Sequence, residues 1–339
     1  MTTQQTNPEQ STAATTTKQS PTERFSGSWF RDQLIRHAMV VVMLLIIAYF
    51  SYRSAQFGTL ENFQSIGVAA APFALIALGQ TLVILTGGID LSVGSIIALS
   101  AMVAAATVEN HPERAWLCVL VAMFVGLAAG AVNGFLVAKV NVPPFIVTLG
   151  MLSTASGLAY VVGGGAPING LPSDFGKIAN TQIFGLPIPV LVMIGGIIAA
   201  ALVMRRTSYG MRIYAVGGNP VAALIAGVKT GRILFSVYAL SGLLAGLSGV
   251  MLASRVISGP PNLGQGYELH SIAAVVIGGA SLFGGRGSIW GTALGLLLIE
   301  TLNNGLDILI VPSYWQSVIK GVLIVSAVAV DVWSVKRRV

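Results

Sequence analysis

The chain has 339 residues, of which 54% are hydrophobic and only 9% are charged. Soluble domains carry roughly 25% charged residues, so this composition excludes an ordinary soluble globular protein. The single cysteine, Cys118, excludes a disulfide framework and a cysteine-based metal site. The composition therefore indicates a polytopic membrane protein.

The N-terminal segment differs from the rest of the chain. Residues 1–30 are rich in Thr, Gln and Ser and contain no apolar run. Such a segment cannot bury enough surface to fold, so we expect a disordered cytoplasmic tail. Residues 31–339 are expected to form one membrane domain.

Apolar runs predict an all-α architecture. A membrane-crossing helix needs about 20 apolar residues, and the sequence offers about ten such segments. They cover residues 34–52, 65–86, 90–108, 115–138, 143–163, 186–204, 233–254, 269–283, 288–306 and 315–332. The segment 269–283 is short, so it either crosses or enters the membrane without crossing.

The basic residues predict the orientation. Most of the 19 Lys and Arg residues fall on the side of the N-terminus, whereas Arg53, Arg114, Lys177 and Arg255 fall on the other. Basic loops stay in the cytoplasm, which places both termini there. The net charge of +7 is then explained by topology, and no nucleic-acid partner is expected.

Enzyme chemistry finds no support in the sequence. There is no Walker A motif and no Gly-x-Ser-x-Gly motif, and the three histidines lie far apart. We therefore expect no catalytic residue, no cofactor and no bound metal.

A basic segment, residues 205–232, contains a predicted short helix. Asn219 suits the N-cap, Pro220 suits the first helical position, and Gly227 suits the stop. The alanines, Ala222 and Ala223 among them, leave a small-residue surface that fits a groove on a partner. The alternative is a helix lying on the lipid surface.

Polar residues also interrupt the apolar runs. A predicted turn contains Gly87, Gly88, Asp90 and Ser92, and Asp90 is expected to cap the helix that follows. The turn is either an ordinary helix hairpin or part of a broken helix near a translocation path. A similar Gly-Gly turn spans residues 278–288, a hint of duplication.

Glu300 and Lys320 form a candidate intramembrane pair. On two antiparallel helices both would lie roughly 9 Å from the same membrane surface. Opposite charges at one depth can neutralise each other. Alternatively, Lys320 snorkels to the interface and Glu300 reaches a watery cavity separately.

Several motifs resemble one family. Residues 79–95 (GQTLVILTGGIDLSVGS), 217–227 (GGNPVAALIAG), 267–292 and 303–306 resemble the ribose-type permeases of bacterial ABC sugar importers, and the likeness runs from about residue 34 to 333. Glu300 departs from the pattern expected of that family. The resemblance implies a homodimer of two permease copies in the lipid of the bacterial inner membrane, ATP-binding cassette subunits and a periplasmic sugar-binding protein.

The resemblance also assigns roles to residues. The residues that match the family's ATPase-coupling segment are Gly217, Gly218, Asn219, Pro220, Ala222, Ala223 and Gly227. Candidates along the pathway are Asn133, Thr148, Ser153 and Asn303, although each could instead hold neighbouring helices together. We expect a permease for a monosaccharide resembling ribose. The alternatives are a related importer of branched-chain amino acids or nucleosides, and an ion-coupled secondary transporter.

Overall fold

The computed structural model describes residues 38–336, so the predicted disordered tail lies outside the described residues. The chain divides into two units, Met1–Val42 and Met43–Val339. Of the first unit only the beginning of α2 is described, and the architecture below is that of the second.

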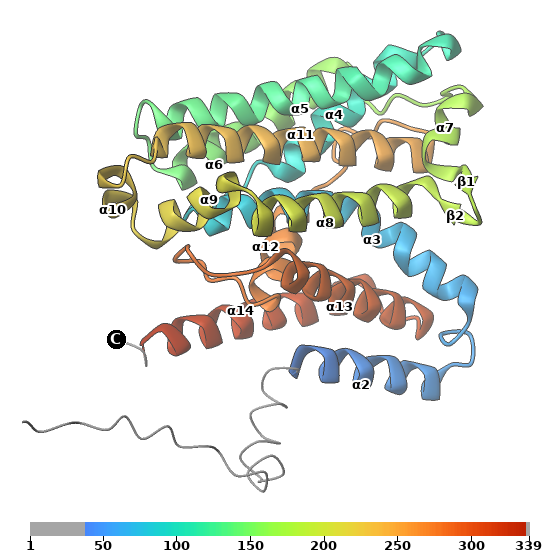
Figure 1. Cartoon of the computed structure of the whole chain (residues 1–339). Coiled ribbons are helices and arrows are strands. Elements are labelled where there is room, and N and C mark those ends of the chain that lie inside the picture. The colour runs from blue at the N-terminus through green and yellow to red at the C-terminus, as the bar shows by residue number, and fades with distance from the viewer. Residues whose placement is uncertain (1–37, 337–339) are drawn as a thin grey trace, which may run out of the picture. The chain divides into compact units, whose positions relative to one another are not determined.

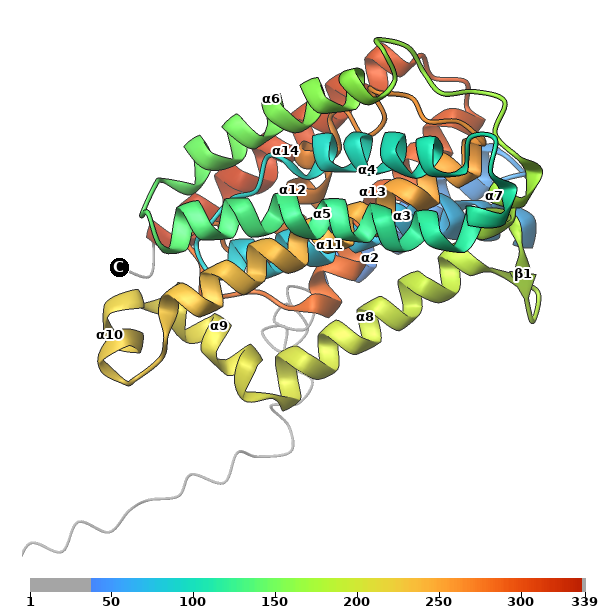
Figure 2. The same ribbon diagram turned by 90° about the horizontal axis from the view of Figure 1, so that it is seen from above.

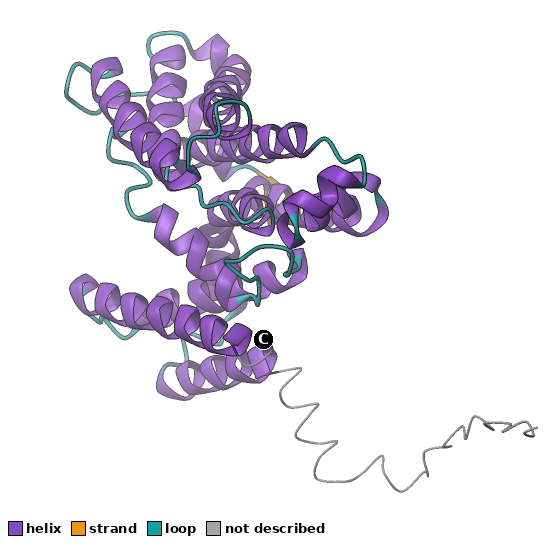
Figure 3. Ribbon diagram, turned by 90° about the vertical axis from the view of Figure 1, so that its left-hand side faces the viewer, coloured by secondary structure: helices purple, strands orange, loops and turns teal. Residues whose placement is uncertain are grey.

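The protein is all-α, as the apolar runs predict (Figure 3). Each of the ten expected segments contains a helix. The helices of those segments are α2 (Ala38–Arg53), α3 (Leu60–Leu85), α4 (Val93–Val108), α5 (Ala115–Ala138), α6 (Pro144–Val162), α8 (Ile188–Arg206), α11 (Thr230–Val256), α12 (Tyr267–Ile277), α13 (Ile289–Ile308) and α14 (Ser313–Lys336).

Short elements fill the connections. They are η2 (Pro112–Arg114), α7 (Ser173–Asn180), the strands β1 (Gln182–Ile183) and β2 (Leu186–Pro187), α9 (Ser208–Gly218) and α10 (Pro220–Ile225). The two strands pair antiparallel. Of these elements the sequence predicts only α10, from its capping residues Asn219, Pro220 and Gly227; none of the short elements carries a membrane-length apolar run. In Figure 1, α10 lies at one end of the bundle, which we call the α10 end, and α7 lies at the opposite end.

Helix α11 is central, and α5 lies beside it (Figures 1 and 2). Glycines line the contact: a Cβ at Gly130 of α5 would lie 3.0 Å from the Cα of Gly242 of α11. Gly126 and Gly246 meet at the next turn in the same way. Small residues permit this close approach of the two backbones. In lipid the hydrophobic effect does not drive helices together, so the van der Waals packing gained by this approach stabilises the pair instead.

Helices α4 and α12 are too short to cross the membrane. At 1.5 Å per residue, the 16 residues of α4 span about 24 Å and the 11 residues of α12 about 16 Å, against a hydrocarbon core of about 30 Å. Among the described residues, five helical segments are long and apolar enough to cross a membrane. The expectation of about ten full spans is therefore not confirmed. Segment 90–108 in particular begins its helix only at Val93, because residues 86–92 are not helical.

Residues 86–92 turn back into the bundle after α3 ends. Gly88 lies against Tyr238 and Asp90 bonds to Ser241, one turn further along α11. Beyond that point α4 follows the second half of α11, where a Cβ on Gly249 would meet the carbonyl of Ile97 at 2.6 Å. The N-terminus of α4 thus lies deep inside the bundle.

Candidate functional site

The predicted helix at 219–227 is confirmed as α10. The Asn219 side chain accepts a hydrogen bond from the Ala222 N–H at 2.9 Å, and Pro220 occupies the first helical position. Gly227 adopts a φ of +81°, a left-handed conformation that glycine tolerates and that ends the helix. The local sequence is sufficient for this element because every capping group lies within it.

The exposed face of α10 differs from the expected one. Ala223 is 5% exposed and packs inward, whereas Val221, Leu224 and Ile225 are exposed, Ile225 to 83%. These three side chains form an apolar surface at the tip of the α10 end, which we call the α10 tip. The helical spacing of Val221, Leu224 and Ile225 could have identified it. In a membrane protein such an exposed apolar cluster contacts either lipid or a partner protein.

Three Gly-Gly pairs meet beneath α10: Gly87-Gly88, Gly217-Gly218 and Gly284-Gly285. A Cβ on Gly284 would lie 2.9 Å from the Gly217 carbonyl oxygen and 2.9 Å from the Gly87 nitrogen. Gly284 has a φ of +85°. A Cβ on Gly285 would lie 2.8 Å from the Cα of Gly218. Backbone packs on backbone here, so a side chain at Gly217, Gly284 or Gly285 must move one of the three segments.

Asp90 is fully buried in the break between α3 and α4. One carboxylate oxygen accepts hydrogen bonds from the Ser92 N–H at 3.0 Å and the Ser92 hydroxyl at 2.6 Å, and the other accepts from Ser241 at 3.0 Å. Ser92, not Asp90, is the N-cap residue of α4. The expectation that Asp90 caps α4 is therefore wrong. Its carboxylate instead accepts hydrogen bonds from Ser92, the residue that precedes the helix.

Other side chains complete this cluster. Asn133 donates to the Ser92 hydroxyl at 2.9 Å. The Gln80 amide, turned to match its partners, donates to the Asp90 carbonyl at 3.0 Å and accepts from the Asp90 N–H at 3.3 Å. Non-helical backbone at membrane depth must be satisfied by protein, and these bonds do so. Gly88 lets the segment pass the Tyr238 hydroxyl, which a Cβ would overlap.

Of the remaining pathway candidates, Thr148 reaches the edge of this cluster, with its hydroxyl 3.4 Å from the Ile89 carbonyl, whereas Ser153 and Asn303 lie elsewhere. Thr148 is buried and donates to the Pro144 carbonyl at 2.9 Å, within its own helix. Ser153 is exposed on α6 and donates to the Leu149 carbonyl at 3.4 Å. Asn303 lies on α13. Their assignment to a pathway stays a prediction.

Glu300 is 5% exposed and accepts a hydrogen bond from Asn303 at 3.4 Å. Lys320 of α14 lines a small gap beside His270. Within the part of the chain that the structure describes, no contact ion pair joins Glu300 to Lys320. Their pairing stays a prediction.

A cavity of about 160 Å³ lies where α4 and α12 begin. Its polar and aromatic lining residues are Ser95, Ser156, Tyr160, Asn262, Gln265 and Glu268. The pathway candidates named from the sequence are not in this lining. The loop 257–266 carries four of the lining residues, Pro261, Asn262, Leu263 and Gln265, and only the folded chain brings it beside α4.

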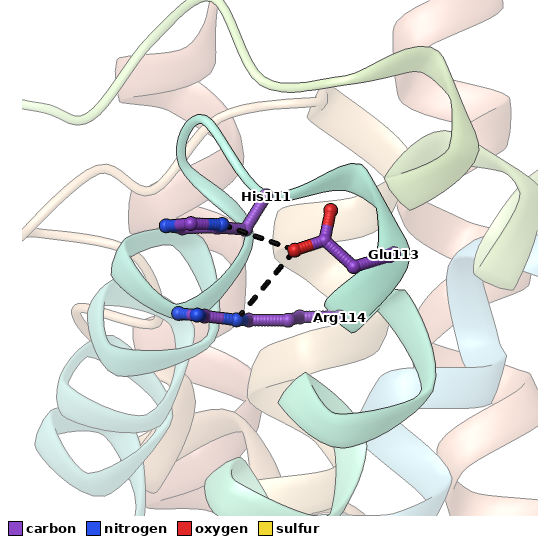
Figure 4. Close-up of polar contacts among 3 residues, drawn as sticks. All are labelled: His111, Glu113 and Arg114. Atoms are coloured by element: carbon purple, nitrogen blue, oxygen red, sulfur yellow. Dashed lines mark hydrogen bonds and ion pairs between the residues drawn. The ribbon is translucent and has the colours of Figure 1, made fainter.

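The surface at the end opposite α10 carries exposed charges between α4 and α5 (Figure 4). Glu113 contacts His111 at 3.0 Å and Arg114 at 3.8 Å. The pKa of the Glu113 carboxyl is lowered, first by a hydrogen bond from its own backbone N–H and then by His111. Solvent screens such pairs, so they contribute little to stability. No group of three His, Cys, Asp or Glu residues that could hold a metal occurs among the described residues.

Comparison with known proteins gives consistent matches. Residues 62–328 match the family described as the permease component of the branched-chain amino acid transport system. Over 311 residues the chain is 42% identical to the ribose import permease protein RbsC of Escherichia coli (strain K12), covering 91% of this chain and 95% of the relative. It is 44% identical to RbsC of Bacillus subtilis (strain 168) over 76% of this chain and 80% of the relative. The D-allose transport system permease protein AlsC of Escherichia coli (strain K12) is 36% identical over 87% of this chain and 91% of the relative. No solved structure matches the chain.

Proposed function

We propose that this chain, which belongs to the permease family of the branched-chain amino acid transport system, forms the membrane pathway of a monosaccharide importer that a separate ATPase subunit drives. The resemblance predicted from the motifs at 79–95, 217–227 and 267–292 is confirmed by the relatives. Those relatives are named for ribose and D-allose, so a ribose-like sugar is the cargo that fits best. The chain is a multi-pass membrane protein.

The observation that carries the coupling to an ATPase is the α10 tip. Its exposed apolar side chains project from a helix whose ends are fixed by Asn219 and Gly227. Directly behind it, Gly217 packs against the end of α3. A partner that binds the tip can therefore push on the bundle through a rigid contact. This arrangement favours docking over the alternative of a helix resting on lipid.

The distribution of basic residues supports a cytoplasmic location of the tip. Helices α5, α8 and α11 all have an end at the α10 end (Figure 1). The basic residues at those helix ends and in the connecting segment are Lys139, Arg205, Arg206, Arg212, Lys229 and Arg232. The last described turn of α14 lies at the same end. By the positive-inside rule this end faces the cytoplasm. The opposite end, with its exposed charges near Glu113, is then the side on which a periplasmic sugar-binding protein delivers its cargo to a dimer of this chain.

The test is a charge placed on the α10 tip. In cells that carry the complete importer, Ile225→Glu should abolish co-purification of the ATP-binding subunit and sugar uptake, while the chain inserts normally. A carboxylate cannot be desolvated in an apolar contact without a large cost. The matched control is Phe184→Glu, because Phe184 is 99% exposed at the opposite end. It should keep the ATP-binding subunit.

Retention of the subunit by Ile225→Glu would contradict the docking role of the tip. Vesicles that contain only this chain provide a second check. If they accumulate D-ribose in response to a proton or sodium gradient, the chain is an ion-coupled transporter instead.

A further inference from the structure

The cavity at the N-termini of α4 and α12 has the shape and chemistry of a small-solute site. Both helices begin inside the bundle, and their first turns meet: a side chain at Gly94 would overlap the Glu268 carboxylate and the Gly264 carbonyl. The loop that brings Gly264 to this depth bends sharply, with φ values of +84° at Gly264 and +83° at Gly266. Glycines at all three positions therefore create the room in which the cavity lies.

The cavity presents hydrogen-bonding groups of several kinds around one aromatic ring. Glu268 supplies acceptors, Asn262 and Gln265 supply both donors and acceptors, and Ser95 and Ser156 supply hydroxyls; Tyr160 is 44% exposed at its edge. Leu152 and Tyr160 lie two turns apart along α6 and give the cavity its apolar wall. This is the composition of a pocket that binds a polar ring with apolar faces.

The size of the cavity suits a small molecule. Its volume of about 160 Å³ is below that of a pocket for a drug-sized ligand. Pockets for drug-sized ligands are about 300–1,000 Å³. A single sugar ring is therefore the appropriate scale, and a disaccharide is too large.

Electrostatics select a neutral polyol over a zwitterion. The N-terminus of a half-length helix attracts negative charge. In this protein the Glu268 carboxylate already lies against the first turn of α4, at Gly94. The carboxylate of an amino acid would meet Glu268 at the position it needs. Sugar hydroxyls can instead donate to Glu268 and carry no charge of their own.

We propose that this cavity is a monosaccharide site within the permease itself, with Glu268 and Tyr160 as its main contacts. This inference rests on the proposed function. Ser156 and Tyr160 lie in the half of α6 that points away from the α10 end, and Leu152 lies near the middle of the helix. The site therefore receives sugar from the side opposite the ATPase. It gives the permease a selectivity of its own, which a passive channel would lack.

The test measures sugar binding by the full-length chain in lipid nanodiscs, using saturation-transfer NMR with D-ribose and with L-leucine. We expect transfer to D-ribose and none to L-leucine. Glu268→Gln and Tyr160→Leu should each weaken D-ribose binding about tenfold, because each removes a direct contact. Glu109→Gln is the matched control, since Glu109 is an exposed acid at the other end of α4, and it should bind as the unaltered chain does. Equal binding by all variants, or stronger transfer to L-leucine, overturns the proposal.

Uptake of D-ribose by cells that carry the complete importer separates this inference from the proposed function. If the unaltered chain supports uptake and Glu268→Gln supports it equally at saturating sugar, the site is refuted and the importer function stands. If uptake falls with Glu268→Gln but not with Glu109→Gln, both stand. Absence of uptake by the unaltered chain, together with absence of binding, refutes both.

Discussion

The backbone N–H of Gly285 donates a hydrogen bond to the backbone carbonyl of Leu85, with an N···O distance of 2.9 Å. The bond ties the loop that precedes α13 to the last residue of α3. A Cβ on Gly217 would overlap that same carbonyl and lie 2.6 Å from the Gly285 nitrogen. Because close-packed groups transmit displacement, a shift of α9 and α10 is passed directly to both segments.

Gly217→Ala should break this contact. The added methyl group must displace the Leu85 carbonyl, which disrupts the bond from Gly285 and costs about 1–3 kcal/mol of overpacking. We expect a lower thermal midpoint for the purified protein and at least tenfold slower sugar uptake in cells with unchanged membrane insertion.

The neighbouring glycine provides a matched control for that change. A Cβ on Gly218 meets no atom within 4 Å among the described residues. Gly218→Ala should therefore leave the thermal midpoint and the uptake rate close to those of the unaltered chain. If the two alanine variants behave alike, the contact between Gly217 and Leu85 does not transmit motion.

Asp90→Asn should destabilise the break between α3 and α4. The carboxylate accepts three hydrogen bonds, and an amide in its place turns an N–H₂ group toward donors from Ser92 or Ser241. Leaving a buried donor unpaired costs about 1–3 kcal/mol. Thermal unfolding followed by fluorescence measures the effect. Asp174→Asn is the control, because Asp174 is half exposed and paired with Lys177, so its loss should cost about 0–1 kcal/mol. Equal midpoints for the two variants would show that the Asp90 cluster is not structural.

A double-mutant cycle tests the predicted pairing of Glu300 with Lys320. Glu300→Gln and Lys320→Met each leave one charge uncompensated in the membrane, which is costly. The double variant removes both charges and should be milder than the sum of the single variants, by an interaction energy of about 0.5–3 kcal/mol. Thermal midpoints of the four proteins give this energy. Additive losses would mean that the two residues act independently.

Much of the helical architecture follows from local sequence. Apolar runs place α5, α6 and α8 within two residues of their observed ends, because a membrane-length run leaves the backbone no other way to satisfy its hydrogen bonds. The start of α10 is equally local, since Asn219, Pro220 and the Ala222 N–H lie within one turn. The short amphipathic helices α7 and α9 escape prediction, because their positions depend on the ends of the long helices.

Contacts between distant segments are harder to foresee. Asn62 and Asn304 exchange two side-chain hydrogen bonds of 2.9 Å, although they are 242 positions apart. The polar run at 303–306 draws attention to Asn303, but nothing in the pattern distinguishes it from Asn304. Which side chain faces a neighbouring helix depends on how the two helices pack, and that is a property of the whole bundle.

Composition and hydropathy alone determined that this chain is a membrane protein and that it folds into helices. Membrane insertion depends on long apolar runs, and helix formation depends on backbone hydrogen bonds within each run, so both are properties of short stretches of sequence. Tertiary structure decided where α4 and α12 begin, that Glu268 lies against Gly94, and that three Gly-Gly pairs converge beneath α10. Those arrangements arise from close packing between segments separated by more than sixty residues. The free energy of such packing is shared among partners that no single stretch of sequence contains.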